Sequence, residues 1–124
     1  MVNSMLAIYQ QQGKLPVWHL VGNETNTMPG NSGIHVVVDA YLKGFRGFDT
    51  ALAWEAVRAT AMLDERGMNY VKKYGYIPAD SMVESTAMGL EYAIADWGSA
   101  KSESLSCQKD RSSQRAAGPT IDQR

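Results

Sequence analysis

The segment Thr50–Asp64 constrains the fold of this chain most strongly. At helical spacing its apolar residues cover most of the circumference: Leu52, Trp54, Ala56, Val57, Ala59, Met62 and Leu63. A helix that is apolar nearly all round is buried between neighbours. Asp49 is suited to cap this helix by accepting a bond from a free backbone N–H, and Gly67 ends it. The fold therefore has to place packing partners on two sides of this helix.

Two earlier segments carry apolar stripes at helical spacing. The first predicts a helix over Asn3–Gln12, which Gly13 and Pro16 prevent from continuing. The second predicts a helix over Ile34–Lys43, which Gly44 ends. Its run of three valines also has strand propensity, so a strand is the competing prediction.

The second half of the chain begins with a predicted loop, because Gly75 and Pro78 interrupt the segment Lys72–Asp80. A fourth helix is expected from Ser85 to about Trp97. We expect its apolar stripe to be buried: Leu90, Ala93, Ile94 and Trp97. Paired helices joined by loops predict an all-α fold, either an α/α toroid or an all-α repeat. Four helices are too few to close such a ring.

Residues 98–124 differ in composition from the rest of the chain. They are rich in serine, poor in hydrophobic residues and basic, whereas residues 1–97 are acidic. This composition predicts a disordered tail, so we place a boundary near Trp97. A shift of reading frame or a wrongly assigned gene end would produce such a tail.

The overall composition excludes several classes of protein. With 124 residues, 44% of them hydrophobic and 20% charged, the chain is expected to form one globular domain. A net charge of -1 argues against nucleic-acid binding, and no apolar run is long enough to span a membrane. The first residues lack a signal-peptide pattern, so export of this exact chain is not expected. The single Cys107 excludes an internal disulfide.

The polar loop between the first two helices holds the candidate functional residues. They are His19, Asn23, Glu24 and Asn26. Sugars are recognised by planar hydrogen-bonding groups and an aromatic platform, for which Trp18 is suited, and Glu24 could also transfer a proton. The alternative interpretation is that Asn23, Thr25 and Asn26 bond to the backbone of their own loop.

The two histidines, His19 and His35, could bind a metal or carry a proton. No other His or Cys stands at ligand spacing, so the metal pattern is weak. His35 lies inside a predicted helix, where packing is the favoured interpretation. For His19, in the loop, both interpretations stay open.

Eight short pieces of the sequence together carry a family resemblance. In order they are Val2-Asn-Ser-Met-Leu, Gly13-Lys-Leu-Pro-Val-Trp, Gly22-Asn-Glu-Thr-Asn, Asp39-Ala-Tyr-Leu-Lys-Gly, Phe48-Asp, Arg66-Gly, Tyr74-Gly-Tyr-Ile-Pro-Ala-Asp and Leu90-Glu-Tyr-Ala-Ile-Ala-Asp-Trp. Through them, residues 2–97 resemble the central part of the calcium-dependent α-mannosidases of glycoside hydrolase family 92. The order and spacing of so many pieces make the resemblance specific.

The resemblance implies an exo-acting, inverting α-mannosidase of the α-1,2 type, in which a β-sandwich and an (α/α)6 barrel enclose the active site. It implies a mannose-containing glycan as partner and a calcium ion that contacts the mannose hydroxyls. Neither nucleic acid nor a membrane is implied. An acid and a base, about 6.5–9.5 Å apart in inverting enzymes, protonate the leaving oxygen and activate water. Family members are typically periplasmic or extracellular.

The chain departs from the family pattern in its catalytic segments. The family's acid lies in a Glu-Gly-Asn-x-Trp-Gln-Tyr-like segment and its base in an Asp-x-Gly-x-Met-Ser-Ala-Trp-like segment, and neither occurs here. Glu24 does not belong to the family's later Gly-Asn-Glu-Pro segment. This chain has Asn31-Ser32 at a position where many family members have Tyr-His. We therefore assign no catalytic residue and no calcium ligand. The candidate substrate-binding residues are Glu24, Asn23, His19 and Asn26.

Two hypotheses follow for the function of the chain. In the first, residues 1–97 are part of an (α/α)6 barrel, a helical-hairpin segment that is inactive alone because the catalytic acid and base are missing. In the second, the chain is a non-catalytic all-α binding or interaction module.

Overall fold

The computed structural model describes residues 1–116, without the side chains of residues 23, 106 and 108–116. The helices are α1 (Val2–Gln12), α2 (Ser32–Leu42), α3 (Thr50–Met62), α4 (Met68–Tyr74) and α5 (Ser85–Ala116). A small antiparallel hairpin consists of β1 (His19–Leu20) and β2 (Asn23–Glu24). The prediction of an all-α fold is confirmed.

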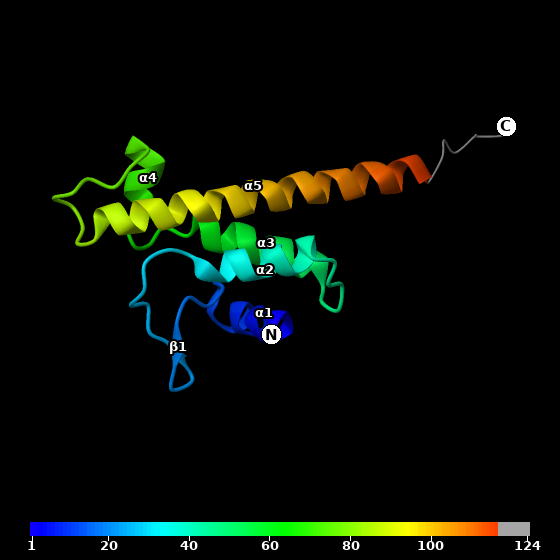
Figure 1. The fold of residues 1–124 in the computed structure, drawn as a ribbon, viewed down its shortest axis with the longest axis horizontal. Helices are drawn as coiled ribbons and strands as arrows, with labels where there is room; N and C mark the ends of the chain where they lie inside the picture. The colour runs from blue at the N-terminus through cyan, green and yellow to red at the C-terminus, as the bar shows by residue number, and fades with distance from the viewer. Residues whose placement is uncertain (117–124) are drawn as a thin grey trace.

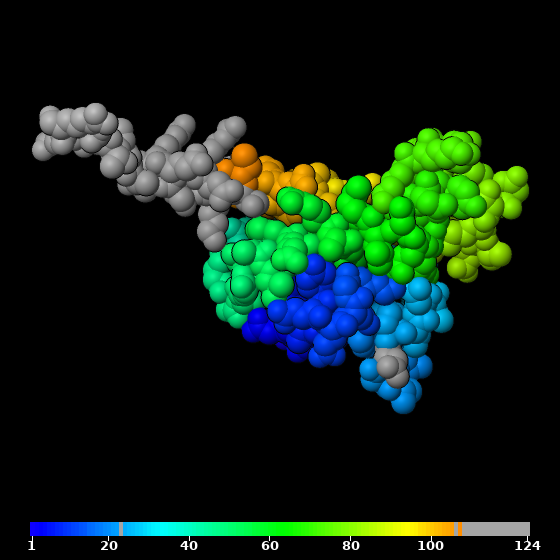
Figure 2. Space-filling view, turned by 180° about the vertical axis from the view of Figure 1, so that it is seen from behind, coloured from blue at the N-terminus to red at the C-terminus, as the bar shows by residue number. Residues whose placement is uncertain are grey.

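The long helix α5 lies across α2 and α3, and α1 packs against those two helices from the other side (Figure 1). The hairpin projects from the helical body between α1 and α2, and Figure 2 shows the same projection from behind. None of the helices in the described range is both long and apolar enough to cross a membrane.

The predicted helix signals act as expected at two ends, whereas α3 already ends at Met62, and Gly67, which was predicted to end it, directly precedes α4. Asp49 Oδ1 accepts hydrogen bonds from the backbone nitrogens of Ala51 at 2.9 Å and Leu52 at 3.1 Å, so it caps α3. Gly13 ends α1 with a φ of 80° and donates its N–H to the carbonyl of Tyr9. The valine run is helical, because burying Val37 and Val38 together against the core requires helical spacing.

Helix α4 corrects the prediction of a loop over Lys72–Asp80. Lys72 to Tyr74 form the last turn of α4, and the loop begins only at Gly75. The seven residues of α4 are too few for a stable helix on their own. Tertiary packing holds it in place, because its buried Met68 belongs to a second cluster with Ile77, Met88 and Tyr92.

Helix α5 corrects the predicted boundary at Trp97. The helix continues without a break to Ala116, so residues 98–116 are helical, and the rest of the predicted tail lies outside the described residues. The continuation still packs on the body. A Cβ atom at Gly98 would lie 3.2 Å from a methyl of Ile34, and Ser102 is buried. Contacts with α2 and α3 therefore hold residues 98–103 on the helical body despite their polar composition.

The main core lies between α1, α2, α3 and α5. Its buried side chains are Met5, Leu6, Leu15, Ile34, Val37, Val38, Ala53, Ala56, Val57, Ala61 and Ala95. The buried face of α5, which reaches both this core and the second cluster, differs from the predicted stripe. Met88, Tyr92 and Ala95 are buried, whereas Leu90, Ile94 and Trp97 are 65%, 54% and 61% exposed. The sequence makes two faces of α5 apolar. The preceding helices, α1 to α4, cover only one of these faces.

Candidate functional site

The predicted polar loop forms the β1–β2 hairpin. His19 pairs with Glu24 and Leu20 pairs with Asn23, which leaves Val21 and Gly22 as a two-residue turn. Both turn residues have positive φ, 54° at Val21 and 81° at Gly22, as in the tight turns that match the twist of a hairpin. Valine is unusual there, because its branched side chain disfavours the left-handed conformation.

The carboxylate of Glu24 is tied to the backbone of its own loop. Oε2 accepts from the backbone nitrogens of Val17 at 2.7 Å and Trp18 at 3.1 Å, while Oε1 accepts from Asn26 N at 2.9 Å. The side chain is only 6% exposed. Glu24 therefore fixes the conformation of the chain on both sides of the hairpin.

The environment of Glu24 keeps it ionised. Burial acts to raise the pKa of this carboxyl group. The backbone donors of Asn26, Val17 and Trp18, together with the nearby imidazole, outweigh burial and place the pKa below its ordinary value. A carboxylate in this state is a hydrogen-bond acceptor at neutral pH rather than a proton donor.

His19 lies on the hairpin beside Glu24. Its Nε2 atom is 3.6 Å from Glu24 Oε2, which is close enough for electrostatic attraction but too long for a hydrogen bond. The imidazole is 27% exposed, and the neighbouring Trp18 is more than half exposed. The hairpin thus presents an imidazole and an indole side by side in sequence, both accessible to solvent.

Asn26 connects the hairpin loop to the turn that precedes α4. Its Oδ1 atom accepts from Lys14 Nζ at 3.1 Å and Arg66 Nη1 at 3.4 Å. Lys14 also pairs with Glu65 Oε1 at 2.7 Å. Lys14, Glu65 and Arg66 are not among the candidate site residues predicted from the sequence. Lys14 and Arg66 do lie in two of the eight sequence pieces that carry the family resemblance. Their place in these pieces was the signal that could have identified them. The contacts themselves could not be predicted, because the partners lie far apart in the sequence.

The alternative interpretation, in which polar side chains secure their own loop, applies to Thr25. Its Oγ1 donates to the carbonyl of Trp18 at 2.9 Å, and its backbone N–H donates to the same oxygen. Glu24 plays the same part, whereas Asn26 bonds to side chains of other segments. The side chain of Asn23 lies outside the described residues.

Within the described part of the chain, no three His, Cys, Asp or Glu side chains gather closely enough to hold a metal ion. A calcium ion takes six to eight oxygen ligands. The residues on the hairpin therefore do not by themselves fit calcium. His35 belongs to α2 rather than to the hairpin, and it lines a groove between α2 and α5.

Comparison with known proteins gives the family. The model of the glycosyl hydrolase family 92 catalytic domain matches residues 1–115. The chain belongs to glycosyl hydrolase family 92. The family match passes the boundary predicted at Trp97 and extends nearly to the end of α5. A comparison with curated proteins gives no match.

Solved structures of family 92 enzymes contain the same arrangement. The family GH92 α-mannosidase BT3965 from Bacteroides thetaiotaomicron is 35% identical, with a TM-score of 0.81 over 89% of this chain. Its complex with mannoimidazole gives 36% identity and the same TM-score over 88%. The family GH92 inverting mannosidase BT2199 from the same organism gives 32% identity and 0.78 over 88%. This family 92 chain spans 15% of the first two chains and 16% of the third.

Proposed function

We propose that this chain is a helical segment of the catalytic domain of an exo-acting, inverting α-mannosidase of the α-1,2 type. The family match over residues 1–115 carries the proposal. Two further findings support it. A similar structure, that of the α-mannosidase BT3965, is described in complex with mannoimidazole, and another is described as an inverting mannosidase.

In this proposal the hairpin contributes to the binding of a mannose-containing glycan. His19 and Asn23 contact sugar hydroxyls, and Trp18 offers an apolar ring face to the sugar. Glu24 and Asn26 act by holding the hairpin in place, because their side-chain oxygens bond to the backbone of the loop and to Lys14 and Arg66. Glu24 is therefore a positioning residue for the substrate contacts.

The remainder of a family 92 domain supplies the chemistry. Inverting hydrolysis needs one carboxylic acid to protonate the leaving oxygen and one carboxylate to activate water, held about 6.5–9.5 Å apart. Glu24 is ionised and bonded to backbone N–H groups, so it does not fill the role of the acid. The calcium ion that the family resemblance implies is held by the remainder as well. The isolated chain is accordingly inactive.

Reconstitution tests this proposal. The BT3965 mannosidase, with the segment matched by this chain deleted, is produced alone and together with the full 124-residue chain. We expect calcium-dependent release of mannose from α-1,2-mannobiose only when both are present. Substitution His19→Ala then raises KM about tenfold, the loss expected for one buried hydrogen bond to substrate.

The matched control is Lys101→Ala, which changes an exposed residue of α5 far along the chain from the hairpin and leaves KM unchanged. A complex of the two polypeptides that forms but releases no mannose contradicts the proposed function. Unchanged kinetics in His19→Ala would remove the hairpin from the substrate site.

A further inference from the structure

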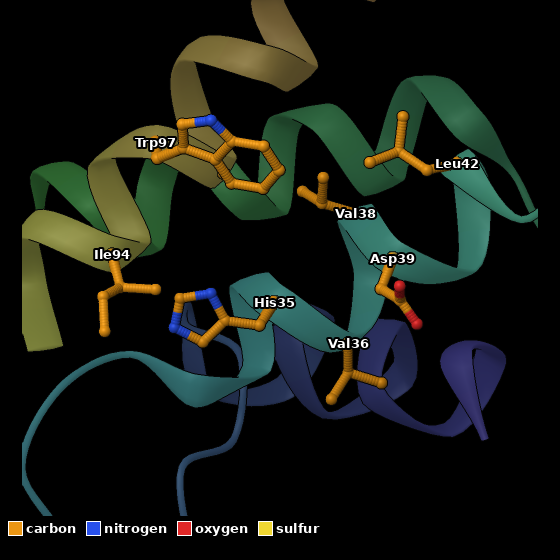
Figure 3. A pocket seen from close by; sticks show the side chains of 8 residues that line it. His35, Val36, Val38, Asp39, Leu42, Ile94 and Trp97 are labelled. Atoms are coloured by element: carbon orange, nitrogen blue, oxygen red, sulfur yellow. The ribbon is translucent and has the colours of Figure 1, made fainter.

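Helix α5 borders hollows on two of its sides. The hollow toward α2, shown in Figure 3, is lined mainly by apolar side chains such as Val38, Ile94 and Trp97. The other lies toward α4, which is across α5 from α2 in Figure 1, and is a cavity of about 310 Å³. We call it the α4–α5 pocket, and its lining includes Tyr76, Ile77, Ser85, Thr86, Gly89 and Asp96. Hydroxyl and carboxylate groups thus gather in this second hollow.

Three polar side chains of the α4–α5 pocket have no partner within the described part of the chain. Ser85, Thr86 and Asp96 form no side-chain hydrogen bond or ion pair there. Ser85 is only 9% exposed, and a buried hydroxyl group is normally hydrogen-bonded. Its oxygen is still accessible, because among the described residues only His35 Nε2 is both enclosed and unpaired. The pocket therefore offers hydrogen-bonding groups to a molecule that enters it.

Two glycines keep the α4–α5 pocket open. Gly75 and Gly89 both line it, and no described atom lies within 4 Å of a Cβ built at either position. Gly33 of α2 is different, because a Cβ there would lie 2.6 Å from the carbonyl oxygen of Pro16. No such contact requires glycine at position 89, and glycine destabilises the interior of a helix relative to alanine. Space for a ligand is a physical reason for a glycine at this point of α5.

An exposed aromatic ring completes the pocket. Tyr76 lines it, is 62% exposed, and has its ring centroid 6.3 Å from that of Tyr74. The apolar side of a pyranose ring packs on an aromatic ring, and its hydroxyls pair with hydroxyl and carboxylate groups. The cavity of about 310 Å³ stands at the lower end of the range for small-molecule sites, about 300–1,000 Å³. Its size and chemistry suit a single sugar ring.

We propose that the α4–α5 pocket binds one pyranose unit of the mannose-containing glycan. Asp96 and Ser85 bond to the sugar hydroxyls, and Tyr76 packs against the ring. The inference rests on the proposed function for the identity of the sugar. None of the hairpin residues lines this pocket, so it is a second sugar contact on the chain. Two linked contacts bind a branched or extended glycan more tightly than one contact does.

Protection of a thiol in the pocket tests the proposal. The full chain carries Cys107→Ser, which removes the exposed native thiol, and Ala93→Cys, which places a thiol in the pocket lining without removing a polar group. Methyl α-mannoside should slow the reaction of this thiol with a maleimide. We expect a factor of about ten when the sugar is present at about ten times its Kd, because bound sugar covers the thiol. The same protection is expected in the complex with segment-deleted BT3965.

Two controls isolate the pocket and the sugar ring. Ala7→Cys in the same background is exposed on α1 outside the pocket, and its labelling should not respond to the sugar. Sorbitol has hydroxyls but no ring, and it should not protect Ala93→Cys. Equal labelling of Ala93→Cys with and without methyl α-mannoside overturns the proposal, as does equal protection by sorbitol. Protection of the isolated chain that is absent from the complex also overturns it, because another part of the domain then fills the pocket.

Filling the pocket should abolish the protection. We expect Gly89→Leu in the Ala93→Cys background to lose it, because the leucine side chain occupies the space beside Gly89. Ala87→Leu is the matched control, since Ala87 is exposed on the same turn of α5 and does not line the pocket. Thermal unfolding should show that Gly89→Leu is at least as stable as the natural chain, because leucine favours a helix over glycine. Unchanged protection in a folded Gly89→Leu variant overturns the proposal.

The carboxylate contact is tested by Asp96→Asn in the Ala93→Cys background. We expect it to raise the Kd for methyl α-mannoside about tenfold, the loss expected for one charged hydrogen-bond acceptor. Asp80→Asn makes the same change of charge at an exposed residue outside the pocket and should leave the Kd unchanged. Equal Kd values in the two variants overturn the role of Asp96. Mannose release from α-1,2-mannobiose is measured separately on the complex, so protection without release refutes the proposed function alone, and release without protection refutes the sugar pocket alone.

Discussion

Glu24 Oε2 lies 2.7 Å from the backbone nitrogen of Val17, across the base of the hairpin. This bond joins the strand that leaves the turn to the segment that enters the hairpin from α1. A second bond from the same oxygen reaches Trp18 N, so one carboxylate sets the path of the chain on both sides. The two aromatic side chains that follow, Trp18 and His19, depend on it for their position.

Removing the Glu24 carboxylate should destabilise the hairpin. We expect Glu24→Ala to lower the free energy of unfolding by about 1–3 kcal/mol, because three backbone N–H groups lose a charged acceptor. Urea unfolding followed by tryptophan fluorescence measures the change. The control is Glu103→Ala, which removes an exposed carboxylate paired with Arg58 and should change the free energy by less than about 1 kcal/mol. Equal effects of both substitutions would contradict the account.

The contribution of Glu24 should depend on pH. Its pKa is lower in the folded state than the ordinary value, so the unfolded chain takes up a proton first as the pH falls. The stabilisation is therefore complete above about pH 5 and is lost as the pH drops through the ordinary glutamate pKa of about 4.3 and then the folded one. We expect the difference in free energy of unfolding between the natural chain and Glu24→Gln to shrink from pH 7 to pH 3. A difference in free energy of unfolding that stays constant from pH 7 to pH 3 would rule out the lowered pKa of Glu24 as the source of this stabilisation.

The turn of the hairpin should be stabilised by a residue that tolerates positive φ. Val21 has a φ of 54° and is 91% exposed, so its side chain contributes little packing. We expect Val21→Asn to raise the free energy of unfolding by about 1 kcal/mol, the approximate cost of a left-handed conformation. Val83→Asn is the control, because Val83 is similarly exposed and has no positive φ. A loss of stability in Val21→Asn would show that the turn needs the valine.

Two glycines should respond in opposite directions to alanine. A Cβ atom at Gly33 would lie 2.6 Å from the carbonyl oxygen of Pro16, so Gly33→Ala should lower the free energy of unfolding by about 1–3 kcal/mol. Gly89 lies within α5 with no described atom within 4 Å of such a Cβ, so Gly89→Ala should raise it by about 0.5–1 kcal/mol. Thermal unfolding followed by circular dichroism measures both. Similar changes in the two variants would contradict the close contact at Gly33.

The sequence predicted those features of the fold that depend on neighbouring residues. Asp49 and Gly13 act within one or two turns of their own position, so their cap signals could be interpreted correctly from the chain alone. The positions of α1, α2 and α3 followed from the same local patterns. The pattern of paired helices joined by loops also predicted the all-α fold that the structure shows.

Features that depend on distant partners could not be predicted in this way. The choice of the buried face of α5 depends on which helices lie beside it, and both of its faces are apolar. Helix α4 is held by Met68 packing against Met88 and Tyr92, which follow it by many residues. At the candidate site, the sequence indicated the polar residues of the loop. It did not indicate that Lys14 pairs with Glu65 and Asn26, because these residues belong to separate segments of the chain.

The central claim is that this family 92 segment depends on the rest of a catalytic domain for its chemistry. The most direct test is an assay of mannose release from α-1,2-mannobiose by the purified 124-residue chain with calcium, beside the complex with segment-deleted BT3965. The account predicts release by the complex and none by the chain alone. Repeated turnover by the isolated chain would contradict it.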